Sequence, residues 1–136
     1  MKLDVLAFGA HPDDIELACS GSLMKLIAEG KSVGIVDLTE GEMGTRGSIF
    51  TRREESANAS KIIGIAVREN LNLGDSSFEL NQETRVKVIE VIRKYKPTIV
   101  LANAVDDRHI DHPKGAQLVK EAFFLSGLSK IVTSSN

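Results

Sequence analysis

Residues 9–14, Gly-Ala-His-Pro-Asp-Asp, decide the fold of this 136-residue chain because they separate two different hydrophobic patterns. The preceding residues 3–8 form a continuous apolar run, which is typical of a buried strand. In the residues that follow, apolar side chains recur at a helical period that only Ser22 interrupts, which predicts a helix over residues 14–29. The stretch is therefore predicted to be a turn between the carboxyl end of a strand and the amino end of a helix, where α/β folds bind ligands.

The rest of the chain repeats this alternation of strand and helix. It implies right-handed crossovers and a parallel sheet that is covered on both faces. The sequence therefore predicts a single domain, residues 1–136, with a Rossmann-like three-layer α/β sandwich. We predict further strands over residues 32–38, 67–73 and 98–102, the start of a fifth over residues 130–133, helices over residues 51–63 and 113–125, and a helix from the N-cap Asn81 to Tyr95.

A second group of histidines and carboxylates, residues 109–112, lies in the loop that follows the fourth predicted strand. If the strands take the common order 3-2-1-4, the first and fourth strands are neighbours, and their carboxyl ends border the crevice in which such folds bind ligands. The turn at residues 9–14 and the loop at residues 103–112 would then meet. For this reason we assign both groups to one site.

The residue types at the two turns favour a zinc site. We assign His11, Asp14 and His112 as ligands, because three nitrogen and oxygen donors leave a position for water, which is typical of a catalytic zinc ion. Zinc lowers the pKa of a bound water to about 7. Asp13 stands beside the ligands in the sequence and is assigned as the general base. The same donors also accept iron(II) and other divalent ions.

Two further side chains complete the predicted catalytic set. His109 lies one helical turn before His112 and could stabilise the oxyanion or protonate the leaving amine. Asp111 could hold His109 in one tautomer. Each group also has a simpler interpretation, since His11 and Asp14 could cap the first helix and Asp111 the fourth. Two histidine–carboxylate groups at matching turns favour the metal site over capping alone.

The composition restricts the class of protein. Hydrophobic residues make up 42% of the chain and charged residues 26%, which excludes a disordered or fibrous class. A net charge of −2, with neither a basic stripe nor a set of stacking aromatic residues, gives no reason to expect nucleic acid or an anionic membrane surface as a partner. No apolar run approaches the length of a membrane span, and the single cysteine, Cys19, fits a reducing compartment. We expect a cytoplasmic protein without a signal peptide.

The two turns also carry a family resemblance. Residues 10–14 with Glu16, and residues 109–112, resemble the paired signatures of the LmbE-like (PIG-L) zinc-dependent N-acetylglucosamine deacetylases. The resemblance runs from residue 3 to about residue 127, and its nearest branch is the bacterial one that deacetylates N-acetylglucosaminyl malate in bacillithiol biosynthesis. It implies zinc on His11, Asp14 and His112, Asp13 as the base, and His109 as the charge-stabilising acid.

The resemblance further implies that an arginine at the start of the second helix contacts the substrate, an N-acetylated amino sugar. Arg52 is preferred over Arg53, and a guanidinium fork would suit a malate carboxylate. The simpler interpretation is that both arginines are solvated helix charges paired with neighbouring side chains. Some relatives form hexamers, which implies a homo-oligomer. Relatives are also longer and have a segment that closes the substrate pocket, so we expect a chain truncated at its C-terminus, either a fragment or a short member.

Two functions of other classes are alternatives. The chain could be a catalytically impaired, zinc-binding fragment or assembly subunit of the same fold, which the expected truncation motivates. It could also be a nucleotide-binding Rossmann module, but the glycine-rich fingerprint is missing after the first predicted strand. Gly41, Gly44 and Gly47 fit neither that fingerprint nor a P-loop, which favours a loop that borders the active site.

Overall fold

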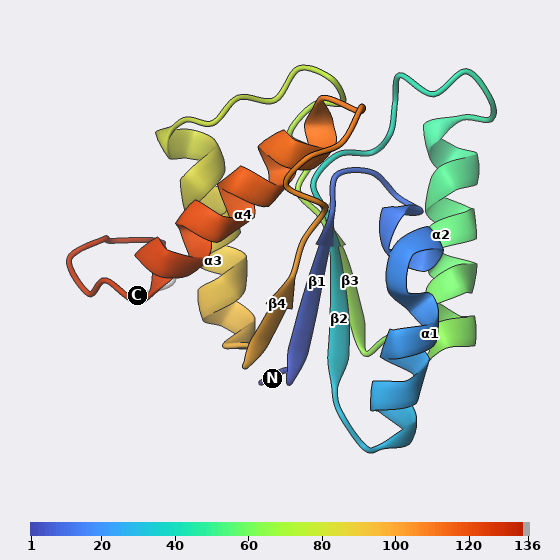
Figure 1. Ribbon diagram of the computed structural model, residues 1–136, viewed down its shortest axis with the longest axis horizontal. Coiled ribbons are helices and arrows are strands. Elements are labelled where there is room, and N and C mark those ends of the chain that lie inside the picture. The colour runs from blue at the N-terminus through green and yellow to red at the C-terminus, as the bar shows by residue number, and fades with distance from the viewer. Residues whose placement is uncertain (135–136) are drawn as a thin grey trace.

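The structure is a computed structural model that describes residues 1–134 (Figure 1). Strands and helices alternate along the chain, as the sequence predicts, and the sheet lies between two pairs of helices in a three-layer α/β sandwich. The elements are β1 (Val5–Gly9), α1 (Asp14–Ala28), β2 (Val33–Asp37), α2 (Ile49–Ile63), β3 (Val67–Asn70), α3 (Gln82–Tyr95), β4 (Ile99–Leu101) and α4 (Asp111–Ser126).

The strands form one parallel sheet in the order β3-β2-β1-β4. The order assumed from the sequence is therefore confirmed. β1 lies between β2 and β4, with Gly9 paired to Asp37 and Ala7 paired to Leu101. All carboxyl ends point to one edge of the sheet, the upper one in Figure 1, which we call the carboxyl edge. The segments that follow β1 and β4 thus leave the sheet side by side, as the predicted site requires.

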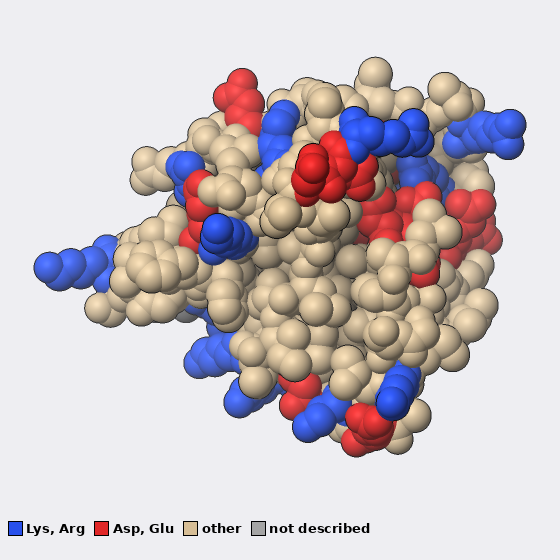
Figure 2. Space-filling model, in the orientation of Figure 1, with Lys and Arg blue, Asp and Glu red and all other residues tan. Residues whose placement is uncertain are grey.

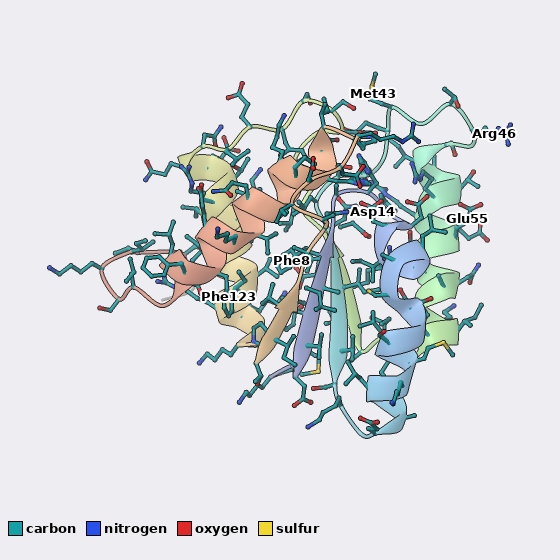
Figure 3. All side chains as sticks on the ribbon, viewed as in Figure 1. Phe8, Asp14, Met43, Arg46, Glu55 and Phe123 are labelled. Atoms are coloured by element: carbon teal, nitrogen blue, oxygen red, sulfur yellow. The ribbon has the colours of Figure 1, made fainter. Side chains whose placement is uncertain are left out.

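Both faces of β1 are buried because helices cover both faces of the sheet. Leu6 and Phe8 belong to a core cluster with side chains of α3 and α4, and Figure 3 shows Phe8 on that side of the sheet. Val5 and Ala7 pack on the opposite face with Ile15 of α1. Successive side chains of a strand point to opposite faces, so a strand covered on both sides is apolar throughout. This explains the continuous apolar run in the sequence.

Capping residues set the starts of α2 and α3. α2 begins at Ile49, two residues earlier than predicted, because Ser48 accepts a hydrogen bond from the N–H of Thr51 at 3.2 Å. Asn81 caps α3 as predicted, since its Oδ1 accepts a hydrogen bond from the N–H of Thr84 at 3.0 Å. Both helices therefore begin where a short polar side chain satisfies a free backbone N–H.

α4 begins at Asp111 and not at Pro113, the predicted start. Pro113 lies in the first turn of the helix, where its missing N–H costs no hydrogen bond. The earlier start moves His112 from the predicted loop into the helix. It also makes Asp111 the first residue of the helix, which matters for the site.

The predicted strand over residues 130–133 is wrong, because this segment is irregular and packs against α3. Arg93 of α3 donates hydrogen bonds to the carbonyl oxygens of Ser126 at 3.1 Å, Leu128 at 2.9 Å and Ile131 at 2.7 Å. These carbonyl oxygens accept hydrogen bonds from the Arg93 side chain in place of the backbone N–H groups of a neighbouring strand. The Ile131 side chain packs against the core cluster, which explains the apolar pattern of the segment.

Acidic side chains gather near the carboxyl edge. Figure 2 shows Asp and Glu side chains close together in the upper part of the view, with Lys and Arg side chains next to them. In Figure 1 the same region is where the strands end and the loops begin. Along residues 1–134, no helix combines the length and the apolar character that a membrane crossing needs.

Candidate metal and catalytic site

Asn103 joins the two turns at the carboxyl edge. It follows β4, and its Oδ1 accepts a hydrogen bond from the N–H of Ala10 at 2.8 Å. Its Nδ2 donates a hydrogen bond to Asp14 Oδ2 at 3.0 Å. One side chain thus fixes the end of β1 and the start of α1 relative to β4. Asn103 was not identified from the sequence, where its place just after a strand was the available signal.

The carboxylate of Asp14 lies between the two predicted histidine ligands. Its Oδ2 accepts a hydrogen bond from the N–H of His11 at 3.0 Å and lies 3.6 Å from His11 Nδ1. Its Oδ1 lies 3.3 Å from His112 Nε2. Burial alone would raise the pKa of Asp14, but hydrogen bonds from His11 and Asn103 lower it to about 2. Asp14 is therefore ionised at neutral pH, and Figure 3 shows it at the start of α1 near the carboxyl edge.

His11 is buried, and its two ring nitrogens face different groups. Nε2 lies 2.9 Å from Asp111 Oδ2 and 3.1 Å from Asp75 Oδ1, whereas Nδ1 is on the Asp14 side. Burial by itself would lower the pKa of His11, but hydrogen bonds to Asp14 and Asp111 raise it to about 9. A ligating histidine commonly donates its second N–H to a carboxylate, which fixes the ring and makes the other nitrogen more basic. The ring is thus oriented to bind a cation through Nδ1.

Asp111, which was predicted to hold His109 in one tautomer, contacts that ring through its backbone N–H, whereas its carboxylate faces His11. The Asp111 side chain is fully buried beside His11, and its Oδ2 also accepts a hydrogen bond from the N–H of Ser76 at 2.8 Å. Because Asp111 is the first residue of α4, its backbone N–H has no partner within the helix and donates to His109 Nδ1 at 3.2 Å. In neutral His109 the proton is therefore on Nε2. Within the described residues, neither α1 nor α4 has a side-chain hydrogen bond at its N-cap, so the capping interpretation gains no support.

The three histidine rings lie against one another. His109 and His112 stack with ring centroids 4.9 Å apart, and His109 meets His11 edge-on at 4.5 Å. His112 Nδ1 lies 3.0 Å from Asp107 Oδ2, which leaves Nε2 facing Asp14. Asp107 thus orients His112 as Asp111 orients His11. It was missed in the sequence, where its signal was a carboxylate five residues before a candidate ligand.

Asp75 is another residue that the sequence did not reveal. Its carboxylate joins His11 to the glycine-rich loop, because Oδ2 accepts a hydrogen bond from the N–H of Met43 at 2.9 Å. Its own N–H donates to Glu42 Oε1 at 2.7 Å. The loop that carries Asp75 has no periodic pattern, and its partners lie far away in the chain. No local signal could have found this contact.

Asp13 combines an exposed carboxylate with a strained backbone. Its φ of 116° lies in the left-handed region, which residues other than glycine rarely adopt and which is enriched at functional sites. The side chain is 56% exposed, whereas its neighbour Asp14 is largely buried. Partial burial raises the pKa of Asp13 above its usual value, and the nearby Arg52 offsets only part of this effect. A raised pKa suits a group that must accept a proton.

Arg52 contacts the turn at residues 9–14. Its Nη2 donates to Pro12 O at 2.7 Å and to Asp13 Oδ2 at 3.2 Å, and its Nη1 donates to Gly41 O at 3.0 Å. The φ of 65° at Gly41 lies in the left-handed region, which explains the glycine at this place in the loop, and a Cβ there would also displace this guanidinium. Arg53 is turned outward, 62% exposed, and forms a surface ion pair. The structure thus places Arg52, the arginine preferred from the sequence, beside Asp13.

The side chains at this site fit a divalent metal ion. Imidazole and carboxylate donors suit zinc, iron(II) and related ions. Among the described residues, potential ligand atoms lie within 4.8 Å of one another in two groups, His11 with His109 and His112, and His11 with Asp75 and Asp111. The second group is explained without an ion, because both carboxylates face His11 Nε2. The ligand set predicted from the sequence takes two histidines of the first group and adds Asp14, which lies next to both.

Comparison with known proteins gives a family and several relatives. The family model described as PIG-L, GlcNAc-PI de-N-acetylase, matches residues 6–123. The chain is 40% identical over 114 residues to the uncharacterized deacetylase YaiS of Escherichia coli K12, a match that covers 79% of this chain and 61% of YaiS. It is 33% identical over 134 residues to diacetylchitobiose deacetylase of Thermococcus kodakarensis, covering 91% of this chain and 50% of that protein.

The chain is also similar to a solved structure and, in sequence, to a relative named as a hydratase. The conserved protein TT1542 of Thermus thermophilus superimposes with a TM-score of 0.94 at 41% identity, over 98% of this chain and 61% of that structure. The 4-oxalmesaconate hydratase of Pseudomonas putida is 27% identical over 130 residues, which is 86% of this chain and 50% of the hydratase. The chain spans 50–61% of the length of these relatives.

Proposed function

Because the chain belongs to the PIG-L family of GlcNAc-PI de-N-acetylases, we propose that it removes the N-acetyl group from an N-acetylated amino sugar by hydrolysis. This membership confirms the family resemblance found in the sequence. One observation carries the proposal: two turns meet at Asp14, which places two histidines and a carboxylate next to the exposed carboxylate of Asp13. The relatives named for deacetylation support this class of reaction over others.

His11, Asp14 and His112 would hold a divalent metal ion, zinc in the first instance, which when bound polarises the amide carbonyl and makes water a stronger nucleophile. Asp13 takes a proton from the attacking water, for which its exposure and raised pKa suit it. His109 donates from Nε2 to the oxygen that becomes negative, because its Nδ1 already accepts the N–H of Asp111.

The proton and the bonds balance in this scheme. The water oxygen forms a bond to the acetyl carbon while its proton moves to Asp13. The bond between the acetyl carbon and the nitrogen then breaks, and Asp13 returns the proton to the leaving nitrogen. The products are acetic acid and a free amino sugar, and Asp13 is again ionised. At neutral pH the acetic acid then gives its remaining proton to the free amine or to solvent and becomes acetate.

For the substrate we propose an N-acetylglucosaminide, and more specifically the N-acetylglucosaminyl malate of bacillithiol biosynthesis. The family resemblance suggests this branch, and the position of Arg52 beside Asp13 is compatible with a substrate carboxylate. Arg52 already donates to Pro12 O and Gly41 O, so substrate would have to compete for these donors. N,N′-diacetylchitobiose has no carboxylate and is the natural comparison.

The test is the release of free amine from both substrates by the zinc-loaded 136-residue chain. Asp13→Asn should keep the parental zinc content and lose turnover by about 10²- to 10⁴-fold. Glu83→Gln, on the distant α3, is the matched control and should change neither. Parental turnover by Asp13→Asn would remove Asp13 as the base. A folded, zinc-loaded chain without turnover on either substrate would instead favour a catalytically impaired, metal-binding subunit.

The proposal extends to assembly and location. We expect a homo-oligomer, with a hexamer as the first candidate, and a cytoplasmic location. Both expectations are based on the sequence and its family resemblance. Light scattering on the purified chain tests the assembly, and a monomeric mass at working concentrations would exclude it.

A further inference from the structure

Arg68 of β3 is the centre of a buried ion network that reaches the first turn of α1. Its Nε and Nη2 donate to the two carboxylate oxygens of Asp37, at 2.7 Å and 2.9 Å. Its Nη1 pairs with Glu16 in the first turn of α1. The side chains of Arg68, Asp37 and Glu16 are only 11%, 4% and 18% exposed. A bidentate pair that is shielded from water holds its geometry far better than a surface ion pair.

The same guanidinium reaches α2. Nη1 donates to Ser56 O at 3.3 Å, and Ser60 Oγ lies at 3.5 Å. The strand alternation explains this direction, because the next residue, Glu69, contacts Lys94 of α3 on the other face of the sheet. One side chain of β3 therefore connects α1 and α2 with the carboxyl end of β2.

α2 needs such a connection in its amino half. Among the described residues of α2 only Ile63 is buried, and it is the last residue of the helix. Arg52 lies near the opposite end, one turn before Ser56, and Asp13 lies about one turn before Glu16. Arg68 thus contacts each helix about one turn from the Arg52–Asp13 ion pair, in which Arg52 Nη2 and Asp13 Oδ2 lie 3.2 Å apart.

We propose that Arg68, acting through Glu16 and Ser56, is a positioning residue that holds Arg52 against Asp13. This inference rests on the proposed function, since the pair matters for turnover only if Asp13 is the base. A positioning role of Arg68 differs from a role in stability alone. A network that only stabilised the fold would leave the kinetics of the folded enzyme unchanged.

The test uses Glu16→Gln, which leaves the Arg68–Asp37 pair in place and removes the charge from the link to α1. Because the Glu16 charge also raises the pKa of Asp13, kcat is compared at a pH where Asp13 is ionised in both chains. The matched control is Glu121→Gln, because Glu121 pairs with Arg85 between α4 and α3 and is 29% exposed. Both variants are studied as zinc-loaded full chains, at a temperature where each is folded by circular dichroism. We expect Glu16→Gln to lower kcat about tenfold at unchanged KM and zinc content. Glu121→Gln should keep the parental kcat.

A second readout does not depend on turnover. Amide hydrogen exchange over residues 49–60 of α2 should be faster in Glu16→Gln than in the parent and in Glu121→Gln. If the parent has no deacetylase activity, the proposed function fails, and the exchange rates alone decide whether the network holds α2. Unchanged exchange, a parental kcat in Glu16→Gln, or an equal loss of kcat in Glu121→Gln would each overturn the inference.

Discussion

Replacing Asp111 by asparagine should weaken metal binding without moving a ligand. The carboxylate of Asp111 faces His11 Nε2 at 2.9 Å and accepts the N–H of Ser76 at 2.8 Å, both through Oδ2. Oδ1 is buried and has no hydrogen-bond partner among the described residues. Asparagine has the same shape, so its oxygen can take the Oδ2 position and keep both bonds. What is lost is the negative charge that makes His11 a stronger ligand.

The size of the effect follows from the type of hydrogen bond that is replaced. A bond to a charged group contributes about 1.5–3 kcal/mol, whereas a neutral one contributes about 1 kcal/mol. The difference of about 0.5–2 kcal/mol corresponds to a dissociation constant for Zn²⁺ that is about 2- to 30-fold higher. The amide NH₂ would replace Oδ1 in a buried place, which adds a cost of about 1–3 kcal/mol to folding with or without metal.

The assay is competition for Zn²⁺ against a chromophoric chelator, with folding checked by circular dichroism. Asp4→Asn is the matched control, because Asp4 lies just before β1, at the end of that strand remote from the site, and binds Ser32. It should leave the dissociation constant unchanged. An Asp111→Asn chain that is folded and binds Zn²⁺ as tightly as the parent would refute the reasoning, since the charge would then not act through His11.

The metal-free chain should lose stability as the pH rises, because the pKa of His11 is raised from 6.5 to about 9 in the folded state. Protonated His11 contributes fully to the free energy of unfolding below pH 6.5, and this contribution is lost as the pH rises through 9. Urea titrations in the presence of EDTA should therefore show a fall in the unfolding free energy of up to about 3 kcal/mol, and a flat profile would contradict this prediction. Asp107→Ala should weaken Zn²⁺ binding less than Asp111→Asn, because the Asp107 side chain is 32% exposed and water can replace it; an equal or larger loss in the chelator assay would count against this. Phe8→Ala should lower the unfolding free energy by about 3–5 kcal/mol in urea, since Phe8 is fully buried between the sheet and its helices, and a change below about 1 kcal/mol would be unexpected.

The architecture could be predicted because it depends on local patterns. The continuous apolar run before residue 9 reflects a strand with both faces covered, and the cap at Asn81 marks the start of a helix. His11, Asp14 and His112 come together because they follow strands that the common topology makes neighbours. Sequence position alone therefore predicted that these three side chains meet.

The partners of these residues depend on long-range packing and could not be predicted. Asp75 reaches His11 across 64 residues of chain from a loop without a periodic pattern. The Asp111 carboxylate faces His11, which lies 100 residues away in the sequence, while the backbone N–H of Asp111 contacts His109. Residues 130–133 look like a strand because a packed loop has the same apolar residues, and only the position of Arg93 distinguishes the two.

The backbone at Asp13 has a consequence for how this position evolves. At a φ of 116° a glycine would be relaxed, whereas an aspartate carries a strain of about 1–3 kcal/mol. In a lineage that stopped using the site, drift toward glycine would therefore be favoured by the gain in stability. In a lineage under selection for the carboxylate, aspartate would persist against that gain. The amino acid found at this one position among descendants of the chain would thus reveal which of them still depend on the site.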